Sequence, residues 1–309
     1  MKRLSLFLPL LAMAFVACQQ SPANPTDYGA IGESIAEKNP QLPTKFVDTT
    51  GGTYAWAKMY NAIQSLENRI APPSGYQRMA FPKGSFGEWL RGVPLKPGNP
   101  KVMLFNGEQK YNQDAQAAVL DIDVGKRDLQ QCADAVMRLR GEYLFSLGKH
   151  DAIHFNFTNG DNCPWTKWRD GYRPTLTTGK TVWNKKMNVS ETHENFRAYM
   201  DLVFTYAGTA SLEKELKKIG TLKDLQVGDV FIQGGFPGHA VLVIDVAENP
   251  DNGHKMYLLA QSYMPAQDIH ILNNPNDPKL SPWYDAQATG PVETPEWTFL
   301  QQDLRRFME

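Results

Sequence analysis

Three residues have the types that cysteine-dependent hydrolysis requires: Cys132, His239 and Gln261. A thiol becomes a strong nucleophile when its thiolate is stabilised and a base can take its proton. Histidine supplies such a base, and a nearby amide oxygen can accept one ring N–H and hold the useful tautomer. The sequence therefore predicts Cys132 as nucleophile, His239 as base and Gln261 as the residue that orients His239.

The segment around Cys132 has the pattern of an amphipathic helix. Apolar residues recur at helical spacing from about residue 129 to Gly148, and Asp128 stands at the expected N-cap. Cys132 then lies in the first turn, where free backbone N–H groups and the helix dipole stabilise a thiolate. Gln130 or Gln131 could donate to an oxyanion beside the Cys132 N–H, or could simply be polar residues at a helix start.

His239 and Gln261 fall on consecutive predicted strands. Residues 229–235 and 239–249 alternate as two strands joined by a Gly-rich hairpin, and residues 255–264 form the next strand. His239 opens its strand and shares a face with Val241. Gln261 is polar within an apolar run, so its amide would lie opposite the histidine.

Each of the three residues also has a structural interpretation. Cys132 could be buried as a small hydrophobe or form a disulfide with Cys163, since two cysteines remain beyond the one near the N-terminus. His239 could be a structural histidine, and Gln261 could satisfy backbone groups.

A loop rich in aromatic residues and arginine is the predicted substrate-binding region. Its residues Trp165, Trp168, Arg169, Tyr172 and Arg173 could wall a groove for a glycan or a peptide, by stacking and by bidentate contacts to carboxylates. Packing of the loop on the core is the competing interpretation.

Other chemistry has weaker support in the sequence. Asp121 and Asp123 share a strand face roughly 7 Å apart, which suits a glycosidase pair, a cation site or an arginine-paired surface. The six histidines show no zinc-binding spacing, so we expect no metal and no cofactor. A formal charge of −1 gives no reason to expect nucleic acid as a partner.

The N-terminus predicts export. A short basic start, an apolar run with Pro9 inside it and Ala17 before Cys18 are typical of a secretory signal, and the run is too short to span a membrane. Residues 15–18 resemble a bacterial lipobox, which implies lipidation of Cys18, with ordinary secretion as the alternative. Gln19 favours the outer membrane over the inner one, so we expect an envelope protein anchored to a membrane through Cys18.

The remaining chain is predicted as a tether and one domain. Residues 1–18 are the signal peptide, residues 19–45 are a Pro-rich tether and residues 46–309 are a single α+β domain. Further helices are expected over 53–70, 194–208 and 211–220, and further strands over 102–110, 115–125, 152–160, 268–274 and 297–307.

Two resemblances refine this picture. VGDVFI followed by PGHAVLVIDV resembles the hairpin of papain-like NlpC-type amidases, which implies a papain-like core with the cysteine helix on an antiparallel sheet, plus N-terminal and insertion helices. The usual aspartate-cysteine-serine-glycine setting is replaced by QQCADA, and the Cys132–His239 separation requires an insertion.

The chain also resembles the bacterial family catalogued as domain of unknown function 4846, over roughly residues 50 to 309. The resemblance is carried by the segments SFGEWLRGVPLKP, AVLDIDVGKRDLQQCADAVMRLRGEYLF and LLAQSYMPAQDIHILNN. That family resemblance implies no activity.

From the three candidate residues, the N-terminus and the hairpin resemblance, we expect an envelope cysteine hydrolase or amidase acting on cell-wall peptide or acyl-amide bonds. The alternative is an inactive envelope binding protein of the same fold that holds a glycan, peptide or protein.

Overall fold

The computed structural model describes residues 46–47 and 53–308, which fall in one compact unit, Leu42–Glu309. The predicted signal peptide, the predicted lipidation site Cys18 and the predicted tether over 19–45 lie outside the described residues. In the part that is described, no helix combines the length and the apolar character needed to cross a membrane.

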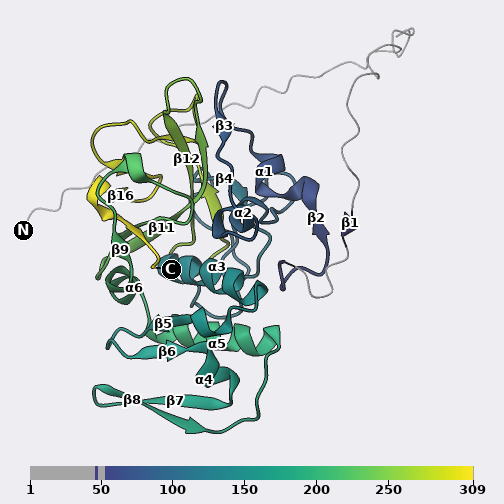
Figure 1. Ribbon diagram of the computed structural model, residues 1–309, viewed down its shortest axis with the longest axis vertical. Helices are drawn as coiled ribbons and strands as arrows, with labels where there is room; N and C mark the ends of the chain where they lie inside the picture. The colour runs from purple at the N-terminus through teal and green to yellow at the C-terminus, as the bar shows by residue number, and fades with distance from the viewer. Residues whose placement is uncertain (1–45, 48–52, 309) are drawn as a thin grey trace, which may run out of the picture. The chain divides into compact units, whose positions relative to one another are not determined.

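The centre of the fold is an antiparallel sheet, for which the described residues give nine strands (Figure 1). Its path runs β4 (Gln116–Val119), β13 (His270–Leu272), β12 (Lys255–Gln261), β11 (His239–Glu248), β10 (Val230–Gln233), β17 (Leu304–Arg306) and β9 (Lys217–Lys218), with β14 (Tyr284–Asp285) on β12 and β3 (Gln77–Arg78) on β11. The α+β class and the antiparallel strands over 229–274 are therefore confirmed.

Three helices pack against this sheet: α2 (Phe86–Arg91), α3 (Cys132–Ser146) and α6 (Thr209–Glu215). Of the others, α1 (Leu66–Arg69) packs on α2, α5 (His193–Tyr206) packs on α3, and α4 (Trp165–Arg169) packs on α5. Helix α3 packs on β11 and β12, where alternate small and aliphatic residues such as Ala240, Leu242 and Ile244 face it. The period of two sends Val241 and Val243 into a second core on the opposite face, as expected for a strand covered on both sides.

Two aspartates hold the start of helix α3 in place. Its first residue is Cys132, and the Asp134 carboxylate accepts the Gln131 backbone N–H at 3.0 Å, so Gln131 occupies the N-cap position. The prediction of Asp128 as N-cap is wrong. The Asp128 carboxylate instead accepts the backbone N–H of Ala266 at 2.7 Å, which ties the start of the helix to the loop after β12.

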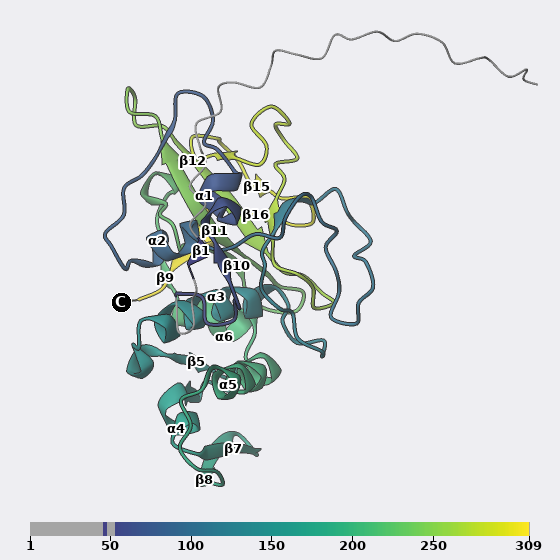
Figure 2. The same cartoon turned by 90° about the vertical axis from the view of Figure 1, so that its right-hand side faces the viewer.

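The smaller elements lie around this core. Two-stranded pairs are β1 (Phe46–Val47) with β2 (Tyr60–Asn61), β5 (His154–Asn156) with β6 (Asn162–Pro164), β7 (Tyr172–Thr177) with β8 (Lys180–Lys185), and β15 (Val292–Glu293) with β16 (Thr298–Phe299); the 3-10 turns are η1 (Ala62–Gln64), η2 (His150–Ala152), η3 (Leu222–Asp224) and η4 (Gln301–Asp303). Figures 1 and 2 both place α4 and β7–β8 beyond α5, on the side of α3 away from the sheet.

Several predicted elements are shorter than expected or absent. The helix expected over 211–220, for example, ends at Glu215 and is followed by the strand β9. The expected helix over 53–70 is reduced to η1 and the single turn α1. Its aromatic residues pack instead as a cluster: the ring centroids of Tyr54 and Tyr60 are 5.2 Å apart, and Tyr54 lies 5.2 Å from Trp89. The expected strand over 102–110 forms only isolated bridges. In the segment 53–70, packing on the non-local partner Trp89 therefore overrides the local pattern.

Candidate functional site

Cys132 is a free, partly exposed thiol at the first position of α3. Cys163 lies on β6, is fully buried and is also free. The two cysteines are not bonded to each other, so the disulfide alternative is wrong. Burial raises the pKa of the Cys163 thiol, in keeping with a side chain that acts as a small core hydrophobe.

The start of α3 lies against the start of β11. The backbone N–H groups of Ala133, Ala240 and Cys132 itself lie close enough to the Cys132 thiol to lower its pKa. Ala240 directly follows His239 in β11, so the backbone contact brings the nucleophile candidate next to the histidine. The fold thus brings the start of α3 and the start of β11 together, although they are far apart in the sequence.

The thiol of Cys132 is not acidified in this structure. Burial, followed by the charge of Asp134, raises the pKa of Cys132 to about 11, although the three backbone N–H groups act in the opposite direction. The expectation that the helix start would stabilise a thiolate is therefore outweighed by desolvation. At neutral pH Cys132 carries its proton.

His239 donates toward Gln261. The distance from His239 Nε2 to Gln261 Oε1 is 2.8 Å, and both side chains are buried at the ends of β11 and β12. An amide oxygen can only accept, so this contact assigns the proton to Nε2 and leaves Nδ1 with its lone pair. The predicted orienting role of Gln261 has a matching geometry.

Glu296 holds the Gln261 amide in that orientation. Gln261 Nε2 donates to Glu296 Oε2 at 2.7 Å, and the same carboxylate oxygen pairs with the ammonium of Lys110. The side chains of Lys110 and Glu296 are 6% and 14% exposed, and burial lowers the pKa of Lys110 while Glu296 raises it. A carboxylate cannot donate, so a flipped Gln261 amide would face it with its oxygen.

His270 closes the other side of this network. It stands opposite Gln261 on β13, and its Nδ1 donates to the Asp268 carbonyl at 2.9 Å. Its Nε2 lies 3.4 Å from Gln261 Nε2 and 3.5 Å from Lys110 Nζ, so it accepts from these donors. Burial first, then the charge of Lys110, lowers the pKa of His270 to about 3, so the ring is neutral.

Aromatic rings shield the His239–Gln261 contact from water. The His239 ring centroid lies 4.8 Å from Tyr263, 5.3 Å from Trp297 and 5.8 Å from Phe299. The side chain of His239 is 2% exposed, and burial lowers its pKa to about 4 although Gln261 raises it. His239 is therefore a neutral base at physiological pH, next to a protonated thiol.

A family model matches most of the described chain. The model is described as a domain of unknown function (4846) and matches residues 66–306. The chain belongs to this family. No curated protein and no solved structure matches the chain. The span of the family domain includes Cys132, His239, Gln261 and the Lys110–Glu296 pair, so the whole network lies within it.

Within the family domain, the predicted substrate loop lies far from Cys132. Trp165 is fully buried on α4, and its ring packs 6.1 Å from that of Phe145, in the last turn of α3. Cys132 is at the other end of this 15-residue helix, roughly 20 Å away at 1.5 Å per residue. These residues are therefore not beside the thiol.

The remaining loop residues are largely occupied by local contacts. The Arg173 guanidinium stacks 3.7 Å from the centroid of Trp168, a ring that is 9% exposed. Arg169 pairs with Asp170, and Tyr172 is exposed on β7. A stacking role would need ring faces that Trp165 and Trp168 already use for packing.

An ionic cluster lies beside the N-terminal half of α3 in the family domain. Arg138 is fully buried and donates to Asp123, to Glu142 and to the Gln130 amide oxygen at 3.0 Å. Although burial raises the pKa of Asp123, Arg138 and Arg197 lower it further. Asp123 is thus arginine-paired, and the Gln130 Nε2 is buried without a partner among the described residues.

Lys110, Glu296 and His270 are the residues that sequence reasoning missed. Lys110 fell within a predicted strand and Glu296 between predicted elements, with no motif around either. A histidine in the apolar strand 268–274 was the one available signal, because a buried histidine needs partners for both ring nitrogens.

Proposed function

We propose that this protein is an envelope-tethered cysteine hydrolase with a papain-like core, acting on peptide or acyl-amide bonds of the cell wall. The observation that carries the proposal is the 2.8 Å contact from His239 Nε2 to Gln261 Oε1 next to a cysteine at a helix start. The order of cysteine, histidine and polar residue, and the resemblance of the hairpin to NlpC-type amidases, agree with that contact.

The proposed reaction uses the neutral pair. Cys132 Sγ attacks the carbonyl carbon as its proton passes to His239 Nδ1, and a C–S bond forms. The backbone N–H groups of Cys132 and Ala133 at the helix start stabilise the oxyanion. His239 then gives its proton to the leaving amine as the C–N bond breaks. Water hydrolyses the thioester by the same route, so the thiol and the neutral imidazole are restored.

Gln261 supports this cycle through the tautomer of His239. While the imidazole is neutral, Gln261 keeps the proton on Nε2 and Nδ1 free. When the imidazolium forms, the amide oxygen and the nearby Glu296 carboxylate stabilise its charge. Glu296 and Lys110 are positioning residues in this proposal, since they act through Gln261.

The proposed location follows from the N-terminus. A lipid on Cys18 would anchor the mature chain to the outer membrane, and residues 19–45 would tether the domain within reach of the cell wall. The natural partners are then the membrane and a cell-wall peptide or glycan.

One observation favours a second candidate function. The pKa of about 11 for Cys132 is the reverse of the activation seen in reactive cysteines. An inactive binding lipoprotein of the same fold, holding a glycan, peptide or protein partner, would keep such a thiol without penalty.

Release of amino groups from soluble cell-wall peptides separates the two candidates. We expect the purified full-length chain to release amines, and Cys132→Ala to reduce the rate at least about 10³-fold. His239→Ala should cost about 10²–10⁴-fold as a lost general base. Cys163→Ala is the matched control and should retain activity, with thermal unfolding used to verify that each variant is folded.

The pH profile gives a second readout. A base must be neutral to take a proton, so kcat/KM should rise as the pH passes through about 4 and stay level near neutral pH. If no amines are released and the same peptides bind equally to wild type and Cys132→Ala, the binding-protein function replaces the hydrolase.

A further inference from the structure

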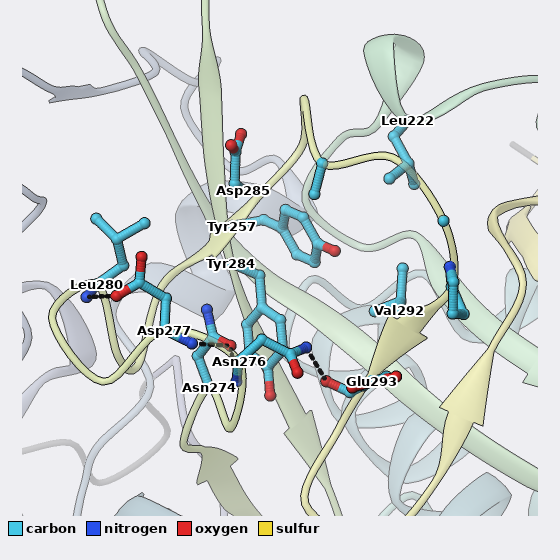
Figure 3. Close-up of a pocket in the computed structure, with 13 residues that line it drawn as sticks. Leu222, Tyr257, Asn274, Asn276, Asp277, Leu280, Tyr284, Asp285, Val292 and Glu293 are labelled. Carbon is cyan, nitrogen blue, oxygen red and sulfur yellow. Dashed lines mark hydrogen bonds between the residues drawn. The ribbon is translucent and has the colours of Figure 1, made fainter.

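A cavity lies at the end of β12 opposite Gln261 (Figure 3). Its volume is about 220 Å³, and its walls come from β12, β14, β15, η3 and the loop that contains Asn274–Leu280. This is smaller than the roughly 300–1,000 Å³ of drug-sized sites, so it suits a side chain or a small amine. We call it the β14 pocket.

Tyr257 presents a hydroxyl to the β14 pocket. The residue is 1% exposed, and Figure 3 shows its hydroxyl pointing into the cavity toward Val292. Tyr284 stacks on it at 5.6 Å, but the Tyr284 hydroxyl donates to the Asn273 carbonyl at 2.6 Å. The Tyr257 hydroxyl has no hydrogen-bond partner among the described residues. The hydroxyl is therefore an unused donor and acceptor at the surface of the pocket, available to a ligand.

The charged groups of the β14 pocket all have one sign. Asp277, Asp285 and Glu293 line it, and its described lining contains no lysine, arginine or histidine. Asp277 Oδ1 accepts the backbone N–H of Leu280, and Asp285 Oδ1 accepts that of Gln287 at 2.7 Å. In the described part of the chain, Oδ2 of each aspartate has no hydrogen-bond partner. The pocket therefore repels anions and offers free acceptors to a cation.

Apolar groups complete the wall. Leu222, Leu280, Pro291 and Val292 line the same cavity. A metal ion or a fully hydrated cation would gain nothing from these aliphatic surfaces, whereas an aliphatic chain would bury surface against them. The ligand that matches both parts is an aliphatic chain that ends in a cation.

We propose that the β14 pocket binds an alkylammonium group, such as a lysine side chain or a short diamine. The methylene chain packs on the aliphatic wall, and the ammonium donates to a free carboxylate oxygen and to the Tyr257 hydroxyl. This site lies at the other end of β12 from Gln261 and does not depend on the proposed hydrolase.

Calorimetric titration of the full-length chain tests the proposal with three probes. They are N-acetyl-lysine methylamide, 1,5-diaminopentane and N-acetyl-norleucine methylamide, the neutral analogue of the first. We expect saturable binding of the two amines, none of the norleucine analogue, and weaker binding at high salt because the pocket is open to solvent.

Variants locate the binding. Asp285→Asn should weaken amine binding at least about tenfold, the size of one lost hydrogen bond to a charged group. Glu293→Gln, an exposed change that leaves the core untouched, should weaken it by a smaller factor. Asp251→Asn, on the exposed β11–β12 turn, is the matched control and should change nothing. Equal binding of the norleucine analogue, no amine binding at all, or an unchanged affinity in Asp285→Asn would overturn the proposal.

Discussion

The two ends of β12 carry polar groups in opposite states. At Gln261 both amide groups are used, by His239 on one side and by Glu296 and His270 on the other. Four residues away along the strand, the Tyr257 hydroxyl has no partner among the described residues and faces a cavity. The same strand therefore supports a closed network at one end and an open pocket at the other.

This difference separates two kinds of site. A network whose donors and acceptors are all paired fixes orientations and tautomers in advance, which suits proton transfer. A pocket with free acceptors gains its partners from a ligand, which suits recognition. Variants at the two ends should therefore have different effects. Changes around Gln261 should alter the free energy of unfolding and the pKa values of the histidines, whereas changes at Tyr257 should alter ligand binding alone.

The largest expected effect is the loss of the Glu296 carboxylate. Glu296→Ala leaves the ammonium of Lys110 buried without its partner and removes the acceptor of Gln261 Nε2. Breaking a buried ion pair on one side costs about 3 kcal/mol, here at the lower end because Glu296 is partly exposed. Urea unfolding measures it. Glu293→Ala, an exposed glutamate on the adjacent β15, should stay within about 0.5 kcal/mol of wild type. Equal stability of the two variants would contradict a closed network.

The next largest expected effect is a fall in the free energy of unfolding as the pH decreases. Burial lowers the pKa of His239 to about 4 and that of His270 to about 3, from an ordinary value of 6.5. Between pH 6.5 and these values the unfolded chain binds protons on both histidines and the folded chain does not, so stability falls as the pH drops.

His270→Gln tests this dependence, because glutamine keeps an acceptor near Lys110 but does not titrate in this range. Between pH 4.5 and 6.5, the free energy of unfolding should change less steeply than in wild type, by up to about 1.4 kcal/mol per pH unit. Urea midpoints at several pH values give the slopes. The same slope in both proteins would show that His270 is already protonated in the fold.

A charge at position 261 should move the titration of His239. Gln261→Glu places a carboxylate at His239 Nε2, which favours the imidazolium and raises the pKa of His239 from about 4 by at least one unit. Proton NMR of the imidazole C–H signals follows this directly. The signal of the exposed His254, on the β11–β12 turn, should be identical in the two proteins. An unmoved His239 signal would mean that Gln261 does not set its state.

Local patterns predicted the elements that carry the Cys132 site. The helix from about residue 129 corresponds to α3, and the strands that bear His239 and Gln261 correspond to β11 and β12, because one face of each element is buried and the apolar spacing records it. In the segment 53–70, the same apolar spacing predicted a helix that is mostly absent from the structure. Met59, one of its apolar positions, is 75% exposed, and the aromatic residues there pack on Trp89 from another part of the chain.

The network around Gln261 could not be predicted in the same way. Lys110 and Glu296 are in contact although 186 residues separate them, and no motif surrounds either residue. The acidity of Cys132 was also predicted in the wrong direction, because the helix start is visible in the sequence while the burial that raises the pKa to about 11 depends on what packs over it. Order along the chain predicts pairing of chemical types, whereas desolvation requires the tertiary fold.

The smallest effect compares two stacked tyrosines that differ in one contact. Tyr284→Phe removes a hydroxyl that donates to the Asn273 carbonyl at 2.6 Å, and should cost about 1 kcal/mol in urea unfolding. Tyr257→Phe removes a hydroxyl without a partner among the described residues, so its free energy of unfolding should equal or exceed that of wild type. The same Tyr257→Phe change should weaken N-acetyl-lysine methylamide binding several-fold, since the ligand then loses a partner. A stability loss in Tyr257→Phe as large as that in Tyr284→Phe would mean that the Tyr257 hydroxyl is already paired in the free protein, and the β14 pocket would then be part of the core rather than a place for a ligand.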